Sequence, residues 1–406
     1  MNQKKGTIGV ATLHFKNRNY GCALQAYALH KQLERLGYSS ELINFSKKDQ
    51  IQSSNENMEI GFSRVFSYSL FEIVKKILRR IVIMLKRIVD KFRKKHFVKS
   101  RALRHQSFDE FEQRFIPQTD IIYTEDNIEE TLQKYDFFVC GSDQIWNPRW
   151  YNAFYRLDFV PEEYPKFSYA ASISTDVLTG EEKDVFKNTL TSYIGVSVRE
   201  KQAVSLLEDL SPVTPVHALD PTLLLDATTW DEIATERIVK EPYVFCYFLG
   251  CGEELRKLAK QYSKKKNIRV VCIPYVLNRY HKLDKKYSDK FIEAASPADF
   301  ISLIKYAEVI FTDSFHATVF SLIYEKEFFV FRRYGFPGMS ARIETLTQMF
   351  GTEERFCDTD EKESVEYIEK CCRIDYSNKQ EFEDLKEQSI AYLTEMLKKS
   401  EEKVNK

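Results

Sequence analysis

The sequence lacks several features that mark whole classes of proteins. No stretch has the roughly 18 consecutive apolar residues of a membrane-spanning helix, and the N-terminal apolar run is too short for a signal peptide. Lysine plus arginine and aspartate plus glutamate number 60 each, so no net charge favours nucleic acid. We therefore expect a cytoplasmic protein that does not bind nucleic acid.

The cysteines and glycines exclude further classes. The eight cysteines lie mostly in apolar runs and show no CxxC spacing, which argues against a disulfide framework and a zinc site. The loop at 16–21 has one glycine where a dinucleotide site would have G-x-G-x-x-G. Acidic residues follow separate expected strands and form no cluster in sequence. We therefore expect no cofactor and no metal ion.

Apolar, strand-like segments alternate with amphipathic, helix-like ones along the chain. Strands are expected at 7–15, 40–45, 135–140, 167–172, 193–200 and 213–219, and then at 243–249, 268–273, 309–312 and 327–331. This alternation is typical of doubly wound parallel sheets, and 406 residues exceed one hydrophobic core. We predict an α/β fold of two Rossmann-like domains facing across a cleft, a glycosyltransferase-B-like arrangement.

The domain boundaries follow from where the strand pattern lapses. The first domain is expected at 1–235 and the second at 236–378, because the chain turns polar between 227 and 242. Residues 379–406 read as a helix that crosses back to the first domain.

Residues 60–105 read as a basic insertion in the first domain. From Leu70 to His105 there are 13 lysines and arginines against two acidic residues. Apolar residues recur at helical spacing between Leu70 and Phe92, which predicts an amphipathic helix with a basic face. Such a helix either contacts an anionic membrane surface or docks its apolar stripe on the protein.

Polar residues follow three of the strands expected in the first domain. Carboxyl ends of parallel strands share one edge of a sheet, and open α/β folds bind ligands there. We predict that these residues line the acceptor side of the cleft, with ordinary turns as the alternative. They are Asn19, Tyr20, Gly21, Gly141, Ser142, Asp143 and Asp220.

The second domain contains a strand, a polar turn and a helix in immediate succession at 309–322. Asp313 and Ser314 are good N-cap residues, and they put His316 in the first helical turn at the ligand-binding edge. An imidazole there can exchange protons near neutral pH beside a helix terminus that suits an anion. Packing or capping by His316 is the structural alternative.

Arg199 ends the strand expected at 193–200. Its guanidinium is suited to bidentate binding of a carboxylate or phosphate. An ion pair with Glu200 or another nearby acid is the alternative.

Six short segments, taken in order, form a recognisable set. They are YGCALQAY at 20–27, GSDQIWN at 141–147, SYAAS at 168–172, VREK at 198–201, LDPTLL at 219–224 and TDSFH at 312–316. This set resembles the polysaccharide pyruvyl transferase family. The resemblance covers most of the chain except the basic insertion and the last residues.

The resemblance implies transfer of the pyruvyl group of phosphoenolpyruvate to a saccharide, as a ketal across two hydroxyls, in cell-surface polysaccharide synthesis. His316 matches the family's SFH motif, where the histidine is the expected acid that protonates the methylene of phosphoenolpyruvate. Arg199 matches the VRE position, a donor clamp. Further donor-binding candidates are Arg342, Lys326 and Ser314.

The expected acceptor is a saccharide linked to a lipid or a nucleotide. In the first case the basic helix would hold the enzyme peripherally at the inner face of an anionic membrane. Two other classes stay open from the residues: a glycosyltransferase that uses a nucleotide sugar in the same cleft, and a non-catalytic saccharide-binding relative.

Overall fold

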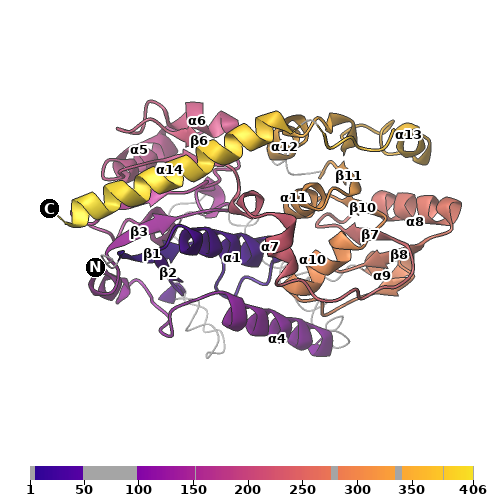
Figure 1. Ribbon diagram of the computed structural model, residues 1–406, viewed down its shortest axis with the longest axis horizontal. Coiled ribbons are helices and arrows are strands. Elements are labelled where there is room, and N and C mark those ends of the chain that lie inside the picture. The colour runs from indigo at the N-terminus through magenta and orange to yellow at the C-terminus, as the bar shows by residue number, and fades with distance from the viewer. Residues whose placement is uncertain are drawn as a thin grey trace, which may run out of the picture.

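The computed structural model describes residues 5–48, 98–150, 152–275, 282–333, 341–377 and 379–405. These residues form two α/β bodies side by side, with the N-terminal half on the left of Figure 1 and most of the C-terminal half on the right. Each body is built around its own parallel sheet.

The sheet of the first domain has the strand order β2-β1-β3-β4, and every pairing in it is parallel. Its strands are β1 (Thr7–Ala11), β2 (Ser39–Leu42), β3 (Phe137–Cys140) and β4 (Lys166–Ser168). A small parallel pair, β5 (Ser197–Val198) and β6 (Val216–His217), adjoins β4 through isolated bridges. All of β3 is apolar and buried, as in parallel sheets covered on both faces.

The sheet of the second domain has the strand order β12-β11-β10-β7-β8-β9 and is also parallel throughout. Its strands are β7 (Tyr243–Tyr247), β8 (Arg269–Cys272), β9 (Lys290–Phe291), β10 (Val309–Thr312), β11 (Glu327–Phe331) and β12 (Phe356–Cys357). The expected strands are therefore present, but those at 193–200 and 213–219 shrink to two residues each.

Helices connect the strands and cover the sheets. In the first domain and its exit they are α1 (Tyr20–Arg35), α4 (Val98–Phe115), η1 (Ile128–Gln133), η2 (Pro148–Trp150), η3 (Ala153–Arg156), α5 (Gly180–Leu190), α6 (Lys201–Leu207), η4 (Pro221–Leu224) and α7 (Ala227–Asp231). Later in the chain they are α8 (Glu254–Lys266), α9 (Lys282–Tyr287), α10 (Pro297–Lys305), α11 (Phe315–Ile323), α12 (Ala341–Met349), η5 (Glu353–Arg355), α13 (Val365–Lys370) and α14 (Gln380–Val404).

The two domains share a cavity and an apolar junction. Loops after β1, β3, β7, β10 and β11 contribute to one cavity, so the carboxyl edges of both sheets face it. At the junction the ring of Tyr20 stacks on Phe300 at 4.7 Å, and its hydroxyl donates to the Ala295 carbonyl. The predicted fold, two Rossmann-like domains facing across a cleft, is confirmed.

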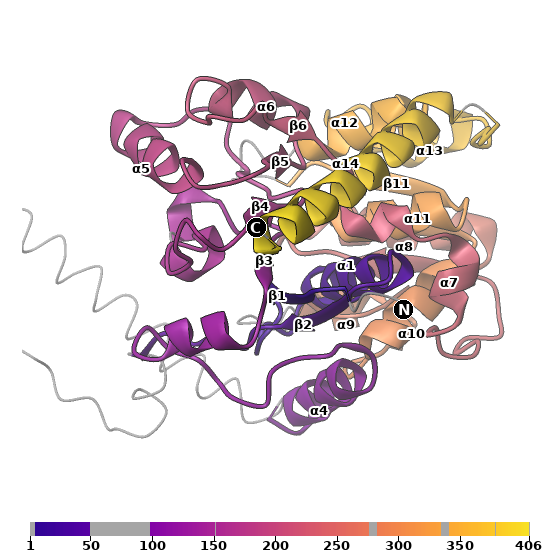
Figure 2. The same ribbon diagram turned by 60° about the vertical axis from the view of Figure 1, so that its left-hand side comes forward.

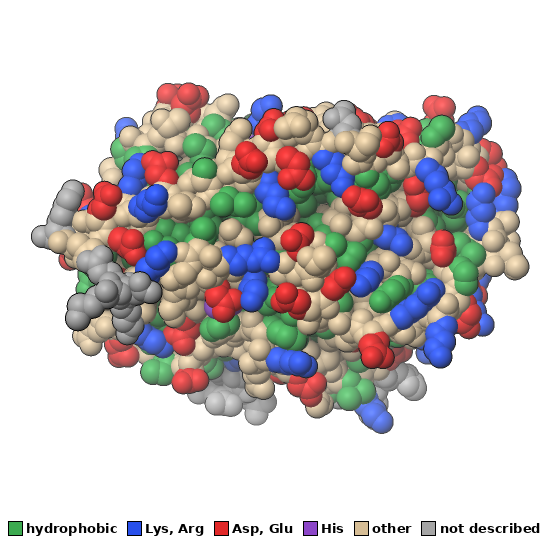
Figure 3. All heavy atoms as spheres, viewed as in Figure 1, with side chains coloured by type: hydrophobic (Ala, Val, Ile, Leu, Met, Phe, Trp, Pro, Cys, Tyr) green, Lys and Arg blue, Asp and Glu red, His purple; other side chains and the backbone are tan. Residues whose placement is uncertain are grey.

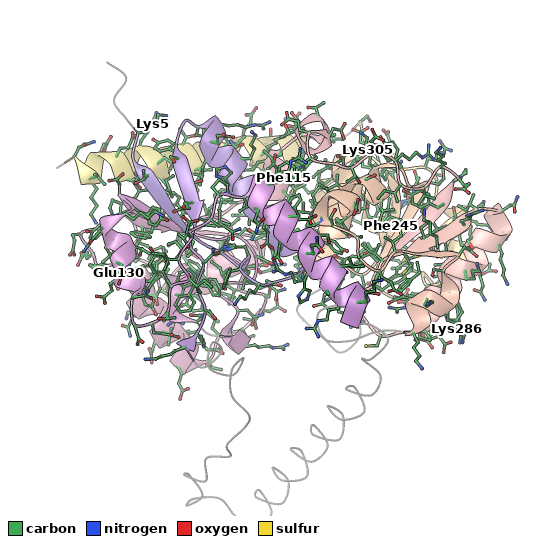
Figure 4. The ribbon with its side chains drawn as sticks, turned by 90° about the horizontal axis from the view of Figure 1, so that it is seen from below. Lys5, Phe115, Glu130, Phe245, Lys286 and Lys305 are labelled. Carbon is green, nitrogen blue, oxygen red and sulfur yellow. The ribbon has the colours of Figure 1, made fainter. Side chains whose placement is uncertain are left out.

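Helix α4 lies across the junction, as Figure 4 shows from below. Near its start, Ser100 bonds Glu293, and Arg104 donates to the Pro274 carbonyl at 2.7 Å. Nearer its end, Glu112 accepts from Arg18 of the first domain. One helix therefore touches both domains.

The last helix, α14, runs from the second domain back over the first (Figures 1 and 2). Ser389 accepts a hydrogen bond from the Leu219 amide at 3.0 Å, and the Tyr392 hydroxyl donates to the Ser168 carbonyl at 2.9 Å. Met396 lies over Gly195, where a Cβ would meet its sulfur at 2.0 Å. The helix expected at 379–406 lies at Gln380–Val404 and contacts the first domain.

The predicted basic amphipathic helix lies outside the described residues, apart from 98–105, which begin α4. Within the part of the chain that the structure describes, no helix is long and apolar enough to cross a membrane. On the face shown in Figure 3, acidic and basic side chains are interspersed over both domains.

Candidate active site

The cavity between the domains has a volume of about 1110 Å³. The first domain contributes Asn17, Asn19, Cys22, Asp143, Gln144, Asn147 and Tyr155, among others, and the second contributes Gly250, Tyr275, Asp313, Ser314, His316, Arg333 and Arg342. A cavity of this size can hold more than a three-carbon donor, because drug-sized ligands occupy roughly 300–1,000 Å³.

The strand-turn-helix at 309–322 forms as the sequence predicts. β10 is buried along its whole length, and the Ser314 side chain caps α11 by accepting from the Ala317 amide at 3.4 Å. Asp313 fixes the neighbouring loop, because its two carboxylate oxygens accept from the amides of Leu249 and Gly250 at 2.6 and 2.7 Å. His316 is thereby held on a rigid helix at the cavity wall.

His316 meets two residues of the first domain. Its Nε2 lies 3.6 Å from Oδ2 of Asp220, an ion-pair distance slightly too long for a hydrogen bond. Its Nδ1 packs against Gly21, where a Cβ would stand 2.1 Å away. The residue is 8% exposed, and Nε2 has no hydrogen-bond partner among the described residues. Any residue larger than glycine at position 21 would displace the imidazole.

Asp220 is the centre of a buried polar network. Its Oδ1 accepts from the amide and hydroxyl of Thr222, and its Oδ2 accepts from Arg199 at 2.7 Å and Ser142 at 3.3 Å. Burial opposes ionisation, but His316 and Arg199 outweigh it and hold the pKa of Asp220 well below its usual range. An ionised Asp220 therefore places a negative charge beside the His316 ring.

Arg199 is 5% exposed and lies beneath the cavity. It pairs with Asp220 at 2.7 Å and approaches Asp143 at 3.5 Å, as the ion-pair alternative anticipated. Its Nε and Nη2 make no hydrogen bond with a described residue, and the guanidinium stacks on Phe315 at 4.7 Å. The structure therefore places Arg199 against the carboxylates that support the site.

Arg342 lines the cavity, and its guanidinium lies 5.2 Å from the centre of the Phe315 ring, which Arg199 also contacts. No ion pair or hydrogen bond joins it to a described residue, and its Nε is buried without a partner. Burial and repulsion by Arg199 and Arg333 lower the pKa of its guanidinium. An anion bound in the cavity would relieve both effects.

Arg333 is a second cavity cation, which the sequence reasoning missed. It donates to the Asp313 carbonyl at 2.7 Å and lines the cavity beside Arg342. The sequence contains a signal for this position. Arg332 and Arg333 directly follow β11 and so stand at the edge of the sheet where ligands bind.

The remaining predicted residues divide into two groups. Asn19 lines the cavity and caps α1 by accepting from the Gly21 amide at 3.0 Å, and Asp143 lines it beside Cys22. Gly141 and Ser142 lie just beneath. Gly141 has φ +124° and a Cβ there would meet the Tyr169 carbonyl oxygen at 2.0 Å, so close backbone packing requires this glycine.

Two predicted residues lie away from both the cavity and the polar network of Asp220. Tyr20 is fully buried in the apolar domain junction. Lys326 precedes β11, at the opposite edge of the sheet from His316, where its carbonyl accepts from Tyr376. The ten residues after His316 are the returning helix α11, which carries Lys326 away. We therefore leave both residues out of the proposed site.

No group of three or more His, Cys, Asp or Glu side chains within the described ranges is arranged to hold a metal ion. The polar groups of the cavity wall are instead a histidine, carboxylates, amides and guanidinium cations.

Two Rossmann-like domains thus enclose a cavity with a histidine–aspartate pair and arginines at its wall. A family model described as polysaccharide pyruvyl transferase matches residues 19–333, and the chain belongs to that family. The resemblance inferred from the six motifs is confirmed. No curated protein matches the sequence.

Several solved structures are similar over nearly the whole chain. They include MnaA of S. aureus with UDP (13% identity, 96% of this chain and 91% of that chain, TM-score 0.49). A UDP-GlcNAc 2-epimerase of Methanocaldococcus jannaschii matches at 11% identity, 96% and 99% coverage and TM-score 0.49. A glycosyltransferase of Rickettsia africae matches at 12% identity, 98% of each chain and TM-score 0.47. These scores are low, so the fold assignment rests on the chain's own sheets.

Proposed function

We propose that this transferase moves the pyruvyl group of phosphoenolpyruvate to two hydroxyls of a saccharide, forming a pyruvate ketal and releasing phosphate. The observation that carries the proposal is the His316–Asp220 pair at 3.6 Å beside cationic Arg333 and Arg342 in a single cavity. Phosphoenolpyruvate is an anionic enol ether, so its protonation requires an acid close to a site that binds anions. The family's name agrees with this chemistry.

His316 acts as the general acid. Protonation of the methylene carbon makes the neighbouring enol carbon an oxocarbenium-like centre that a hydroxyl can attack. A histidine whose ring faces the Asp220 carboxylate is a suitable acid for this step. Asp220 touches only His316 and its own network, and so acts as a positioning residue.

The donor anion binds the arginines. Phosphoenolpyruvate carries a carboxylate and a phosphate, and Arg342 has no anionic partner among the described residues. Arg342 and Arg333 make the donor subsite, with the capped start of α11 at Ser314 close by. The acceptor occupies the first-domain side of the cavity, where amide side chains suit the hydroxyls of a saccharide.

Thermal stabilisation tests the donor assignment. A ligand that binds the native state at about 100 times its Kd adds about 2.7 kcal/mol of stability. We expect phosphoenolpyruvate to raise the unfolding midpoint and a panel of nucleotide sugars to leave it unchanged. A response to a nucleotide sugar without one to phosphoenolpyruvate would favour a glycosyltransferase instead.

A further inference from the structure

The proposed chemistry leaves one proton without a recipient. When the acceptor hydroxyl attacks the oxocarbenium-like carbon, its O–H bond breaks while His316 is completing the transfer of its own proton to the neighbouring methylene carbon. A second group must take the proton, as a carboxylate does when water attacks an oxocarbenium-like centre in inverting glycosidases.

Asp143 is the carboxylate in position to do this. Among the described first-domain residues that line the cavity, it is the one acidic side chain. Of the acids close to His316, Asp220 is buried in its network, and Asp313 has both oxygens bound by backbone amides. Glu254, Asp360 and Glu363 also line the cavity, but from the second domain.

The backbone holds Asp143 rigidly at the cavity wall. Its φ is +62°, in the left-handed region that a residue with a Cβ rarely adopts. Its carbonyl accepts from the amides of Ile145 and Ser172 at 2.8 and 2.9 Å, which fix that conformation. Strain of this kind is concentrated at functional sites.

The carboxylate of Asp143 keeps free acceptor positions. Burial raises its pKa, but Arg199 and His316 outweigh burial and lower the pKa, so the group is ionised. Oδ2 accepts from the thiol of Cys22 at 3.1 Å, a weak donor, and Oδ1 lies 3.5 Å from Nη2 of Arg199. The same guanidinium donates through Nη1 to Asp220, the partner of His316. Arg199 therefore links Asp143 to Asp220, the neighbour of His316. His316 and Asp143 line the same cavity from different domains.

We propose that Asp143 is a catalytic residue that accepts the proton of the attacking acceptor hydroxyl. This inference rests on the proposed function. The new C–O bond forms at the enol carbon as the hydroxyl O–H bond breaks and its proton passes to Asp143. When the C–O bond to phosphate breaks, the phosphate leaves with that proton. The second hydroxyl closes the ketal and returns its proton to His316, so both groups end as they began.

When a substitution removes a carboxylate side chain from the cavity wall, a small carboxylate such as formate can take its place from solution. Asp143→Gly suits a left-handed backbone, so we expect it to fold, and Asp143→Asn serves as a second variant that keeps the shape. Phosphate release from phosphoenolpyruvate is measured with surface saccharides extracted from the source organism as acceptors. Glu325→Gly is the matched control, an acid with φ +49° in the turn after α11, away from the cavity.

We expect Asp143→Gly to lower kcat about a hundredfold to ten-thousandfold, and sodium formate to restore at least part of it. Its Kd for phosphoenolpyruvate should stay close to that of the wild type, and Glu325→Gly should keep wild-type kcat. An Asp143→Gly or Asp143→Asn variant with wild-type kcat would overturn the inference. A loss of kcat in Asp143→Gly that formate does not restore would also overturn it.

The proposed function fails differently. A wild-type protein that neither binds phosphoenolpyruvate nor releases phosphate from it would overturn pyruvyl transfer itself. If that protein consumed a nucleotide sugar instead, rescue of Asp143→Gly by formate in that reaction would still identify Asp143 as the base.

Discussion

Oδ2 of Asp220 and Nε2 of His316 lie 3.6 Å apart although they belong to different domains. Asp220 comes from the loop between β6 and η4, and His316 comes from the first turn of α11. His316 and Asp220 therefore become neighbours only when both domains pack together. The site is a property of the domain junction.

Asp220→Asn should keep donor binding and lose turnover. The amide cannot stabilise an imidazolium, so we expect kcat to fall about a hundredfold or more while the Kd for phosphoenolpyruvate changes little. Losing the anion beside buried Arg199 should also destabilise the fold by about 3–5 kcal/mol. Steady-state kinetics and urea unfolding measure the two effects. Asp226→Asn, at the exposed N-cap of α7, is the control, and an unchanged kcat in Asp220→Asn would contradict the role.

Gly21→Ala should impair the enzyme although alanine is the better helix former. Alanine normally gains about 1 kcal/mol over glycine inside a helix, but here its Cβ would stand 2.1 Å from Nδ1 of His316. We expect a displaced imidazole and a loss of kcat of about tenfold or more. Gly180→Ala, whose Cβ would meet nothing within 4 Å, should be neutral in the same assay. Full activity in Gly21→Ala would show that the ring moves freely.

Arg342→Ala should abolish stabilisation by phosphoenolpyruvate. The variant removes a buried cation that no described anion contacts, so the ligand-free protein should unfold at the wild-type temperature or above it. Lys326→Ala removes a half-buried cation at the opposite edge of the sheet and should leave the ligand response intact. If phosphoenolpyruvate raised the unfolding midpoint of Arg342→Ala as much as that of the wild type, the donor would bind elsewhere in the protein.

Stability should fall as the pH rises from about 5 to 7, because of Glu112. Burial raises its pKa to about 7, against the opposing charge of Arg18. The folded state therefore keeps a proton that the unfolded chain releases near pH 4.3. This difference in pKa lowers the free energy of unfolding by about 3–4 kcal/mol at and above pH 7. Urea unfolding at pH 5 and 7.5 should show this loss in the wild type and less of it in Glu112→Gln. An equal pH slope in both proteins would refute it.

The sequence was sufficient for the local structure of the site. Apolar β-branched residues at 309–312 and the N-cap residue Ser314 determine β10 and the start of α11 through short-range effects. Sheet order then follows from parallel pairing, so the loops that face the cavity could be predicted from where strands end.

Long-range pairing could not be predicted in this way. Asp220 and Arg199 reach His316 only through the domain junction, and no local pattern marks that contact. The family resemblance suggested Lys326 as a donor contact, but helix α11 carries the chain from His316 toward the other sheet edge. Tyr20 follows a loop at the ligand edge, yet its ring points into the junction and stacks on Phe300.

Solvent deuterium tests the central claim most directly. In D₂O, with phosphoenolpyruvate and extracted surface saccharides, His316 should deliver one deuteron to the methylene carbon. We predict a ketal whose methyl group carries one deuterium, with one phosphate released per ketal, and no product from His316→Gln. A ketal methyl free of deuterium, or intact phosphoenolpyruvate while a nucleotide sugar is consumed, would contradict the account.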